Sequence, residues 1–220
     1  MWAVLPVKAF AEAKQRLAGV LDAGQRAALA KAMMRDVLRA LAATPALEGI
    51  MVISPDPAVL EIGASFGAIG EREARPTGYN HAVAQAAARV IAGAGDGMLL
   101  LPGDVPLVTP GDLQELLRGQ PAAPAAAVVG DRGRGGTNAL VLSPADLIAP
   151  VFGDDSFARH CAAVRAAGVE PRTPALPGLA LDIDLPEDLG LLLRQTQATE
   201  SGRLLQEINA TTPLAGPAGK

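Results

Sequence analysis

The stretch that decides the fold lies at positions 98–106 and reads Met-Leu-Leu-Leu-Pro-Gly-Asp-Val-Pro. Its four apolar residues are typical of a short buried strand, and the Pro-Gly pair predicts a sharp turn where that strand ends. Because Gly103 lets the backbone turn, Asp104 is expected at the carboxyl end of the strand, where open α/β sheets bind ligands. The alternative is an aspartate that only hydrogen-bonds the backbone of its own turn.

Similar apolar runs recur on both sides of this stretch, separated by segments with helical periodicity. Strands are predicted at Ala3–Val7, Ile50–Ser54, Met98–Leu101, Ala126–Val129, Ala139–Leu142 and Leu181–Leu185. Helices are predicted over 23–43 and 82–92, and Pro110 and Pro186 each open another with acidic residues in the first turn. Strands spaced by helices predict an α/β fold with a mostly parallel sheet and helices on both faces.

The domain organisation follows from the absence of internal repeats. Residues 1–195 are expected to form one domain, and residues 196–220 a C-terminal helix or tail that is partly flexible. The chain is 50% hydrophobic with a mean hydropathy of +0.26, which fits a packed domain and excludes general disorder.

The net charge and the aromatic content limit the classes of partner that the chain can bind. A net charge of −4 and a pI near 5.2 argue against nucleic acid, which normally requires a basic surface. An aromatic content of 3% argues against a stacking platform for single strands. The one cysteine, Cys161, fits a reducing compartment, and no apolar run is long enough to cross a membrane. The expected location is the cytoplasm.

A pair of aspartates lies within residues 181–185, which read Leu-Asp-Ile-Asp-Leu. In a strand the side chains alternate, so Asp182 and Asp184 would share one face while the leucines and isoleucine face the core. Together with Asp104 they would form an all-oxygen site suited to Mg²⁺. The alternative is a solvated edge strand that runs into the helix opened by Pro186.

Positive charge follows the first predicted strand, at Lys8, Lys14 and Arg16. Such a run is often a solvated helix face, but directly after a first parallel strand it also lies where a triphosphate would bind. The G-x-x-x-x-G-K-[ST] phosphate loop is absent, and the glycines at 130–136 do not fit G-x-G-x-x-G. P-loop kinases and ordinary dinucleotide-dependent dehydrogenases are therefore disfavoured.

Two later segments are suited to a small anion. Gly135–Asn138 precedes a predicted strand and offers backbone amides and the Thr137 hydroxyl; Phe152–Ser156 precedes a helix whose free N–H groups favour a phosphate or carboxylate. For Ser156 or Asp155 the alternative is plain N-capping. His160 is expected on a helix face, and Cys161 is expected to be buried and not a nucleophile.

Taken in order, these segments resemble the phospholactate guanylyltransferases of deazaflavin coenzyme (factor 420) biosynthesis. The resemblance runs from about Trp2 to Leu192 and is carried by Pro6–Lys8, Lys14–Leu17, Thr77–Ala82, Leu101–Leu107, Gly136–Leu140, Phe152–Gly153 with Ser156, and Leu181–Asp184. It implies a single-domain fold like that of nucleotide-diphospho-sugar transferases, which is GT-A-like and related to the Rossmann fold. It also implies transfer of GMP from GTP to a phosphorylated three-carbon acid, with release of pyrophosphate.

The resemblance assigns roles residue by residue. The resemblance implies that Mg²⁺ is bound by Asp104, Asp182 and Asp184, and that the acceptor acid is bound by Thr137, Gly153 and Ser156. It implies that the catalytic cations near the triphosphate are Lys8, Lys14 and Arg16. It also implies that the nucleotide is bound by Lys8, Gly78, Asn80 and Asp104. The sequence departs from the usual Gly-Leu-Asn, because Tyr79 stands in the middle and His81 follows. Guanine selectivity is therefore less firmly implied than the chemistry.

The implied chemistry needs few reactive side chains. The attacking phosphate is already ionised near neutral pH, so the transfer requires positioning and charge neutralisation and no protein nucleophile or general base. The acceptor stays open among 2-phospho-L-lactate, phosphoenolpyruvate and 3-phospho-D-glycerate. The resemblance also allows a homodimer.

Two alternatives stay open for the function. Another small nucleotidyltransferase, of the molybdopterin guanylyltransferase or cytidylyltransferase type, is disfavoured because the glycine-rich phosphate loop of those families is absent after Val7. A nucleotide-binding protein without turnover would share the fold but release no pyrophosphate.

Overall fold

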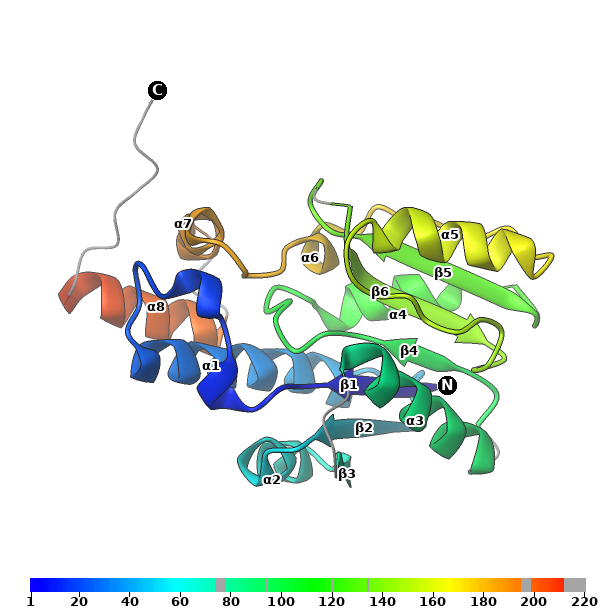
Figure 1. Cartoon of the computed structure of the whole chain (residues 1–220), viewed down its shortest axis with the longest axis horizontal. Helices are drawn as coiled ribbons and strands as arrows, with labels where there is room; N and C mark the ends of the chain where they lie inside the picture. Colours follow the sequence, from blue (N-terminus) through cyan, green and yellow to red (C-terminus); the bar gives the residue numbers. More distant parts are fainter. Residues whose placement is uncertain (74–77, 94, 120, 134, 195–198, 212–220) are drawn as a thin grey trace.

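The computed structural model describes residues 1–73, 78–93, 95–119, 121–133, 135–194 and 199–211. Within these residues, six strands form one sheet in the order β3-β2-β1-β4-β6-β5 (Figure 1). The strands are β1 (Trp2–Pro6), β2 (Gly49–Ser54), β3 (Ile69–Arg72), β4 (Met98–Leu100), β5 (Ala125–Gly130) and β6 (Thr137–Ser143).

The sheet is mostly parallel, as predicted. Strands β3, β2, β1 and β4 pair in parallel, and β6 is antiparallel to both β4 and β5. Among the described strands, β6 therefore runs against the other five. The carboxyl ends of β1 and β4 lie side by side, because Trp2 pairs with Met98 and Val4 with Leu100.

The helices begin largely where sequence signals place them. They are α1 (Ala23–Ala42), α2 (Pro57–Ser65), α3 (Tyr79–Ala92), α4 (Pro110–Arg118), α5 (Ser156–Ala166), α6 (Pro177–Ala180), α7 (Pro186–Arg194) and α8 (Glu200–Thr211), with 3-10 turns at Phe10–Glu12 and Gln15–Leu17. Asp22 and Thr109 open α1 and α4 with reciprocal capping boxes. No helix within the described residues has both the length and the apolarity needed to span a bilayer.

Helices cover both faces of the sheet, as Figure 1 shows and as the sequence predicts. Along β1, Leu5 belongs to a core shared with α1, α2, α4 and α6, whereas Val4 belongs to a core shared with α3 and α5. This alternation is the period-2 pattern of a strand buried on both faces.

A third apolar cluster packs α7 and α8 against α1 and the segment after β1. Leu17 and Leu21 pack there with Leu29 and Met33 on a second stripe of α1 and with residues of α7 and α8. Figure 1 shows α8 lying along α1.

The prediction of a strand at Leu181–Leu185 is wrong. This segment lies outside the sheet, although Ile183 N–H donates a hydrogen bond of 3.1 Å to the Asp104 carbonyl. Leu181 and Ile183 are buried because they pack into the third cluster. The apolar/polar alternation thus has a different cause from the one inferred: the segment packs on a hydrophobic cluster, and none of the strands that the structure describes pairs with it.

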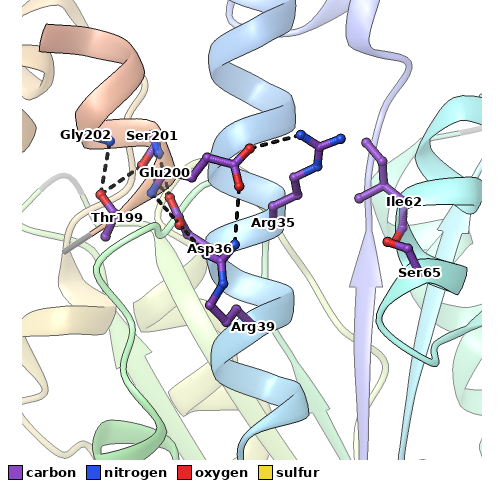
Figure 2. A network of polar contacts seen from close by, with 9 residues as sticks. All are labelled: Arg35, Asp36, Arg39, Ile62, Ser65, Thr199, Glu200, Ser201 and Gly202. Atoms are coloured by element: carbon purple, nitrogen blue, oxygen red, sulfur yellow. Dashed lines mark hydrogen bonds and ion pairs between the residues drawn. The ribbon is translucent and has the colours of Figure 1, made fainter.

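A buried carboxylate fastens α8 to α1. Asp36 accepts hydrogen bonds from the Glu200 N–H at 2.8 Å, the Ser201 N–H at 2.9 Å and the Ser201 hydroxyl at 2.7 Å, and it also pairs with Arg39 (Figure 2). Because the first N–H groups of a helix have no partner within the helix, Asp36 serves α8 as a cap from another part of the chain.

The C-terminal region is described only in part. The helix expected there is present as α8, whose Leu205 and Ile208 are buried. The expected boundary at 195/196 and the expected flexible tail concern residues 195–198 and 212–220, which lie outside the described residues.

Candidate functional site

A cavity of about 420 Å³ opens at the carboxyl ends of β1 and β4. Several segments that are distant in sequence meet there, and among the residues that line it are Val7, Lys8, Lys14, Arg16, Tyr79, Gly103, Asp104 and Asp184. The predicted turn after the fourth strand thus presents Asp104 to a cavity at the expected edge of the sheet.

Lys14 occupies the centre of this site. Its backbone is left-handed, with φ 53° and ψ 41°, an uncommon conformation for a residue with a side chain, at the start of the 3-10 turn Gln15–Leu17. Its side chain is only 8% exposed. The Nζ donates hydrogen bonds to Asp184 Oδ1 at 2.8 Å and to Asp104 Oδ2. The strained backbone conformation thus accompanies a side chain that joins two carboxylates.

The charge of Lys14 is secured by these partners. Burial works to lower the pKa of the ammonium, but the charges of Asp104 and Asp184 and the hydrogen bonds to them outweigh it, so the pKa of Lys14 is raised. Lys14 therefore remains protonated at neutral pH.

The other two predicted cations are more accessible. Arg16 is 71% exposed in its side chain and lies 3.6 Å from Asp184 Oδ2, and Lys8 is exposed at the cavity wall. Lys14 is thus buried between the two carboxylates, Arg16 pairs with Asp184 from the solvent side, and Lys8 is exposed at the same cavity.

The three predicted metal ligands differ in their partners. Asp104 and Asp184 line the cavity and share Lys14, but Asp182 accepts a hydrogen bond of 3.3 Å from the Asn138 side chain. Within the described residues, no group of three His, Cys, Asp or Glu side chains is arranged to hold a metal ion. Two carboxylates combined with water and substrate phosphate are nevertheless a usual donor set for Mg²⁺, so Asp104 and Asp184 fit such an ion. The metal remains a prediction.

A second cavity of about 420 Å³ adjoins the first and shares Lys8 and Tyr79 with it. Gly78, the N-cap of α3, lines this cavity with φ 111°, a backbone conformation that residues with side chains rarely adopt. Tyr79 follows, and its Oη is buried with no hydrogen-bond partner among the described residues. Burial, helped by the charge of Asp104, raises the pKa of Tyr79, so the phenol stays protonated.

Asn80, predicted to contact the nucleotide, has backbone partners. Phe152 N–H donates to Asn80 Oδ1 at 2.8 Å, and Asn80 Nδ2 donates to the Phe152 carbonyl at 3.2 Å. This two-way pairing ties α3 to the segment before α5. Thr77, which belongs to the same motif, lies outside the described residues.

The predicted acceptor residues come from two neighbouring segments. Thr137 starts β6 and is buried, Gly153 has φ 125°, and Ser156 is the buried first residue of α5. Ser156 N–H donates to the Gly153 carbonyl at 3.1 Å, and Asp155, the residue before α5, makes no capping bond with its side chain. Simple N-capping by Asp155 therefore does not explain this segment.

His160 is the residue that sequence reasoning missed. It lies in α5, as expected, but it is also fully buried, and it links Thr137 Oγ1 at 2.9 Å to the Val151 N–H at 2.9 Å. Burial, together with the charge of Arg159, lowers the pKa of His160 to about 4. The signal available in the sequence was its i+4 spacing from Ser156, which places both on one side of α5. Cys161 is buried as predicted.

Comparison with known proteins gives a consistent result. The family model described as "Guanylyl transferase CofC like" matches residues 1–218. A phosphoenolpyruvate guanylyltransferase of Conexibacter woesei is 38% identical over 96% of this chain and 98% of its own. A 2-phospho-L-lactate guanylyltransferase of Methanothermobacter thermautotrophicus is 34% identical over 95% and 91%.

Solved structures agree on the fold. A protein of Desulfovibrio desulfuricans G20, assigned to the nucleotide-diphospho-sugar transferases, superposes with a TM-score of 0.73 over 95% of each chain at 18% identity. At that identity the likeness concerns the fold alone, and it confirms the expected architecture.

Proposed function

Because the chain belongs to the CofC-like guanylyl transferase family and is a nucleotidyltransferase, we propose that it transfers GMP from GTP to a phosphorylated three-carbon acid and releases pyrophosphate. The observation that carries this proposal is the bridge from Lys14 to Asp104 and Asp184 in a cavity that also exposes Lys8 and Arg16. A site that combines paired carboxylates with three cations is suited to phosphates and a metal ion together.

The reaction is a displacement at phosphorus. A phosphate oxygen of the acceptor attacks the α-phosphorus of GTP, a new P–O bond forms, and the bond to the β-phosphate oxygen breaks with the electron pair leaving on pyrophosphate. Lys8 and Arg16 bind and neutralise the charge that grows on the leaving group. No proton has to be removed from the acceptor, because its phosphate is already ionised. The site therefore needs no general base.

Lys14 has a positioning role in this scheme. With its pKa raised it keeps its positive charge, holds Asp104 and Asp184 at a fixed separation and offsets their mutual repulsion before substrates arrive. Mg²⁺, held by Asp104 and Asp184 with Asp182 as the third predicted ligand, would supply neutralisation of the α-phosphate charge.

The two substrates are assigned to different parts of the site. The cavity lined by Gly78 and Tyr79 is proposed for the nucleoside, and Thr137, Gly153 and Ser156 are proposed for the acceptor. The names of the relatives favour phosphoenolpyruvate or 2-phospho-L-lactate as the acceptor, with 3-phospho-D-glycerate as a third candidate. The product would serve deazaflavin coenzyme biosynthesis in the cytoplasm, and we propose a homodimer.

A substrate panel tests this function. GTP, CTP and ATP are each incubated with Mg²⁺ and one of the three acids, and released pyrophosphate is measured. We expect release with GTP and at least one acid, and little with CTP or ATP. Release with CTP alone would point to a cytidylyltransferase, and nucleotide binding without release for every acid would point to a non-catalytic protein.

A further inference from the structure

His160 lies between the two segments that carry the proposed acceptor residues. Its ring is fully buried and meets the Phe152 ring edge-on, with centroids 4.7 Å apart. Both ring nitrogens are engaged, Nδ1 with Thr137 Oγ1 and Nε2 with Val151 N, each at 2.9 Å. The side chain thus connects the start of β6 with the segment that precedes α5.

The partners of His160 determine where its proton lies. The Val151 N–H is a donor, so Nε2 has to be the acceptor and carries no hydrogen. In the neutral ring the proton is then on Nδ1, which donates to Thr137 Oγ1. Burial lowers the pKa of His160 to about 4, which keeps this neutral form at physiological pH.

The tautomer has a consequence for Thr137. Because Oγ1 accepts the Nδ1 hydrogen, the hydroxyl proton of Thr137 cannot point back to the ring and is left to donate elsewhere. The segment Val151–Phe152, which precedes α5, is also held by side chains: Val151 N–H donates to His160, and Phe152 exchanges two hydrogen bonds with Asn80. The hydroxyl orientation therefore depends on the His160 ring, and the position of the segment Val151–Phe152 depends on that ring together with Asn80.

We propose that His160 is a positioning residue for the acceptor acid: it orients the Thr137 hydroxyl as a hydrogen-bond donor and holds Gly153 and Ser156 beside it, so that the three receive one anionic group, a carboxylate or phosphate. The inference rests on the proposed function, because it takes these three residues as the acceptor site. It goes beyond that function by assigning a role to a buried side chain that does not itself touch substrate.

Three substitutions separate the two hydrogen bonds. His160→Gln has the length to accept from Val151 N–H but loses the donor to Thr137; His160→Asn has a donor near the position of Nδ1 but is too short to reach Val151; His160→Phe loses both and keeps a ring against Phe152. Cys161→Ala, which alters packing on the same helix without removing a hydrogen bond of His160, is the matched control.

The readout is the KM for the acceptor acid beside the KM for GTP, measured by pyrophosphate release. We expect His160→Gln and His160→Asn to raise the acceptor KM about two- to tenfold and His160→Phe to raise it further, with the GTP KM unchanged. An unchanged acceptor KM in His160→Gln and His160→Asn, or an equal rise in Cys161→Ala, would overturn the proposal. If His160→Phe does not fold, those two variants decide. Absence of turnover in the unmodified protein would instead overturn the proposed function, and this proposal with it.

Discussion

Lys14 Nζ lies 2.8 Å from Asp184 Oδ1, although 170 residues separate the two in sequence. The same ammonium bonds Asp104, which follows β4. One buried cation therefore joins the segment after β1, the turn after β4 and the extended segment before α7. The relative placement of these three segments at the cavity depends on this contact, because each segment comes from a different part of the fold.

Replacement of Lys14 by methionine is the first prediction. The substitution keeps the stem of the side chain and removes the charge, which leaves Asp104 and Asp184 to repel each other. We expect pyrophosphate release to fall about a hundredfold or more. Because both carboxylates are partly exposed, water relieves part of the cost, and the free energy of unfolding should fall by only about 1–3 kcal/mol. Arg118→Met, which removes an exposed charge on α4, should change neither quantity.

Substitution of the cavity carboxylates is the second prediction. Asp104→Asn and Asp184→Asn each remove one charged oxygen ligand, so activity should fall strongly and the Mg²⁺ concentration for half-maximal rate should rise about tenfold or more. Titration of activity with Mg²⁺ measures this. Asp182→Asn shows whether the third predicted ligand shares the ion, and Asp146→Asn, on an exposed site, serves as the control. Near-normal Mg²⁺ dependence in both cavity variants would contradict the metal assignment.

Removal of the Tyr79 hydroxyl is the third prediction. The Oη is buried without a partner among the described residues, whereas the ring packs edge-on against Phe152 at 4.8 Å. Tyr79→Phe keeps that ring contact, so we expect the free energy of unfolding to rise by about 1 kcal/mol and Tm to rise by about 2–4 °C. Tyr79→Leu, which loses the ring, should be less stable than Tyr79→Phe. A loss of stability in Tyr79→Phe would show that the hydroxyl has a partner.

The pH dependence of stability is the fourth prediction. The pKa of His160 is lowered from 6.5 to about 4, so between these values the unfolded chain binds more protons than the folded one. The stability that His160 contributes is full above pH ~6.5 and is lost as the pH falls toward ~4. From pH 7 to pH 5, unmodified protein should lose about 2 kcal/mol more than His160→Phe. Urea unfolding at the two pH values measures this, and equal losses would contradict the lowered pKa.

Local signals explain what the sequence could predict. The helix starts at Ala23, Pro110 and Pro186 appear where the pattern places them, because capping residues and prolines act within a few residues of a helix start. The apolar runs that form β1, β2 and β4 are recognisable because these strands are buried. Strand β3 was missed because its residues Ile69–Arg72 are largely exposed at the sheet edge and lack an apolar pattern.

Long-range contacts explain which features could not be predicted from the sequence. The pairing of Asn80 with Phe152 joins residues 72 apart, and a motif that resembles a base-binding segment gives no hint that its amide is used in this way. For the same reason the pattern at Leu181–Leu185 predicts a strand that does not form: its alternation is real, but the surface that buries Leu181 and Ile183 comes from the segment after β1 and from α1, α7 and α8. The burial of His160 likewise depends on residues outside α5.

The central claim is guanylyl transfer to a phosphorylated three-carbon acid. The most direct measurement is a single reaction that contains GTP, Mg²⁺ and equal amounts of phosphoenolpyruvate, 2-phospho-L-lactate and 3-phospho-D-glycerate, followed by mass spectrometry of the products. The account predicts that one guanylylated acid accumulates in step with pyrophosphate, and that both form about a hundredfold or more slowly with Lys14→Met. GTP that stays intact, or pyrophosphate released without any guanylylated acid, would contradict it.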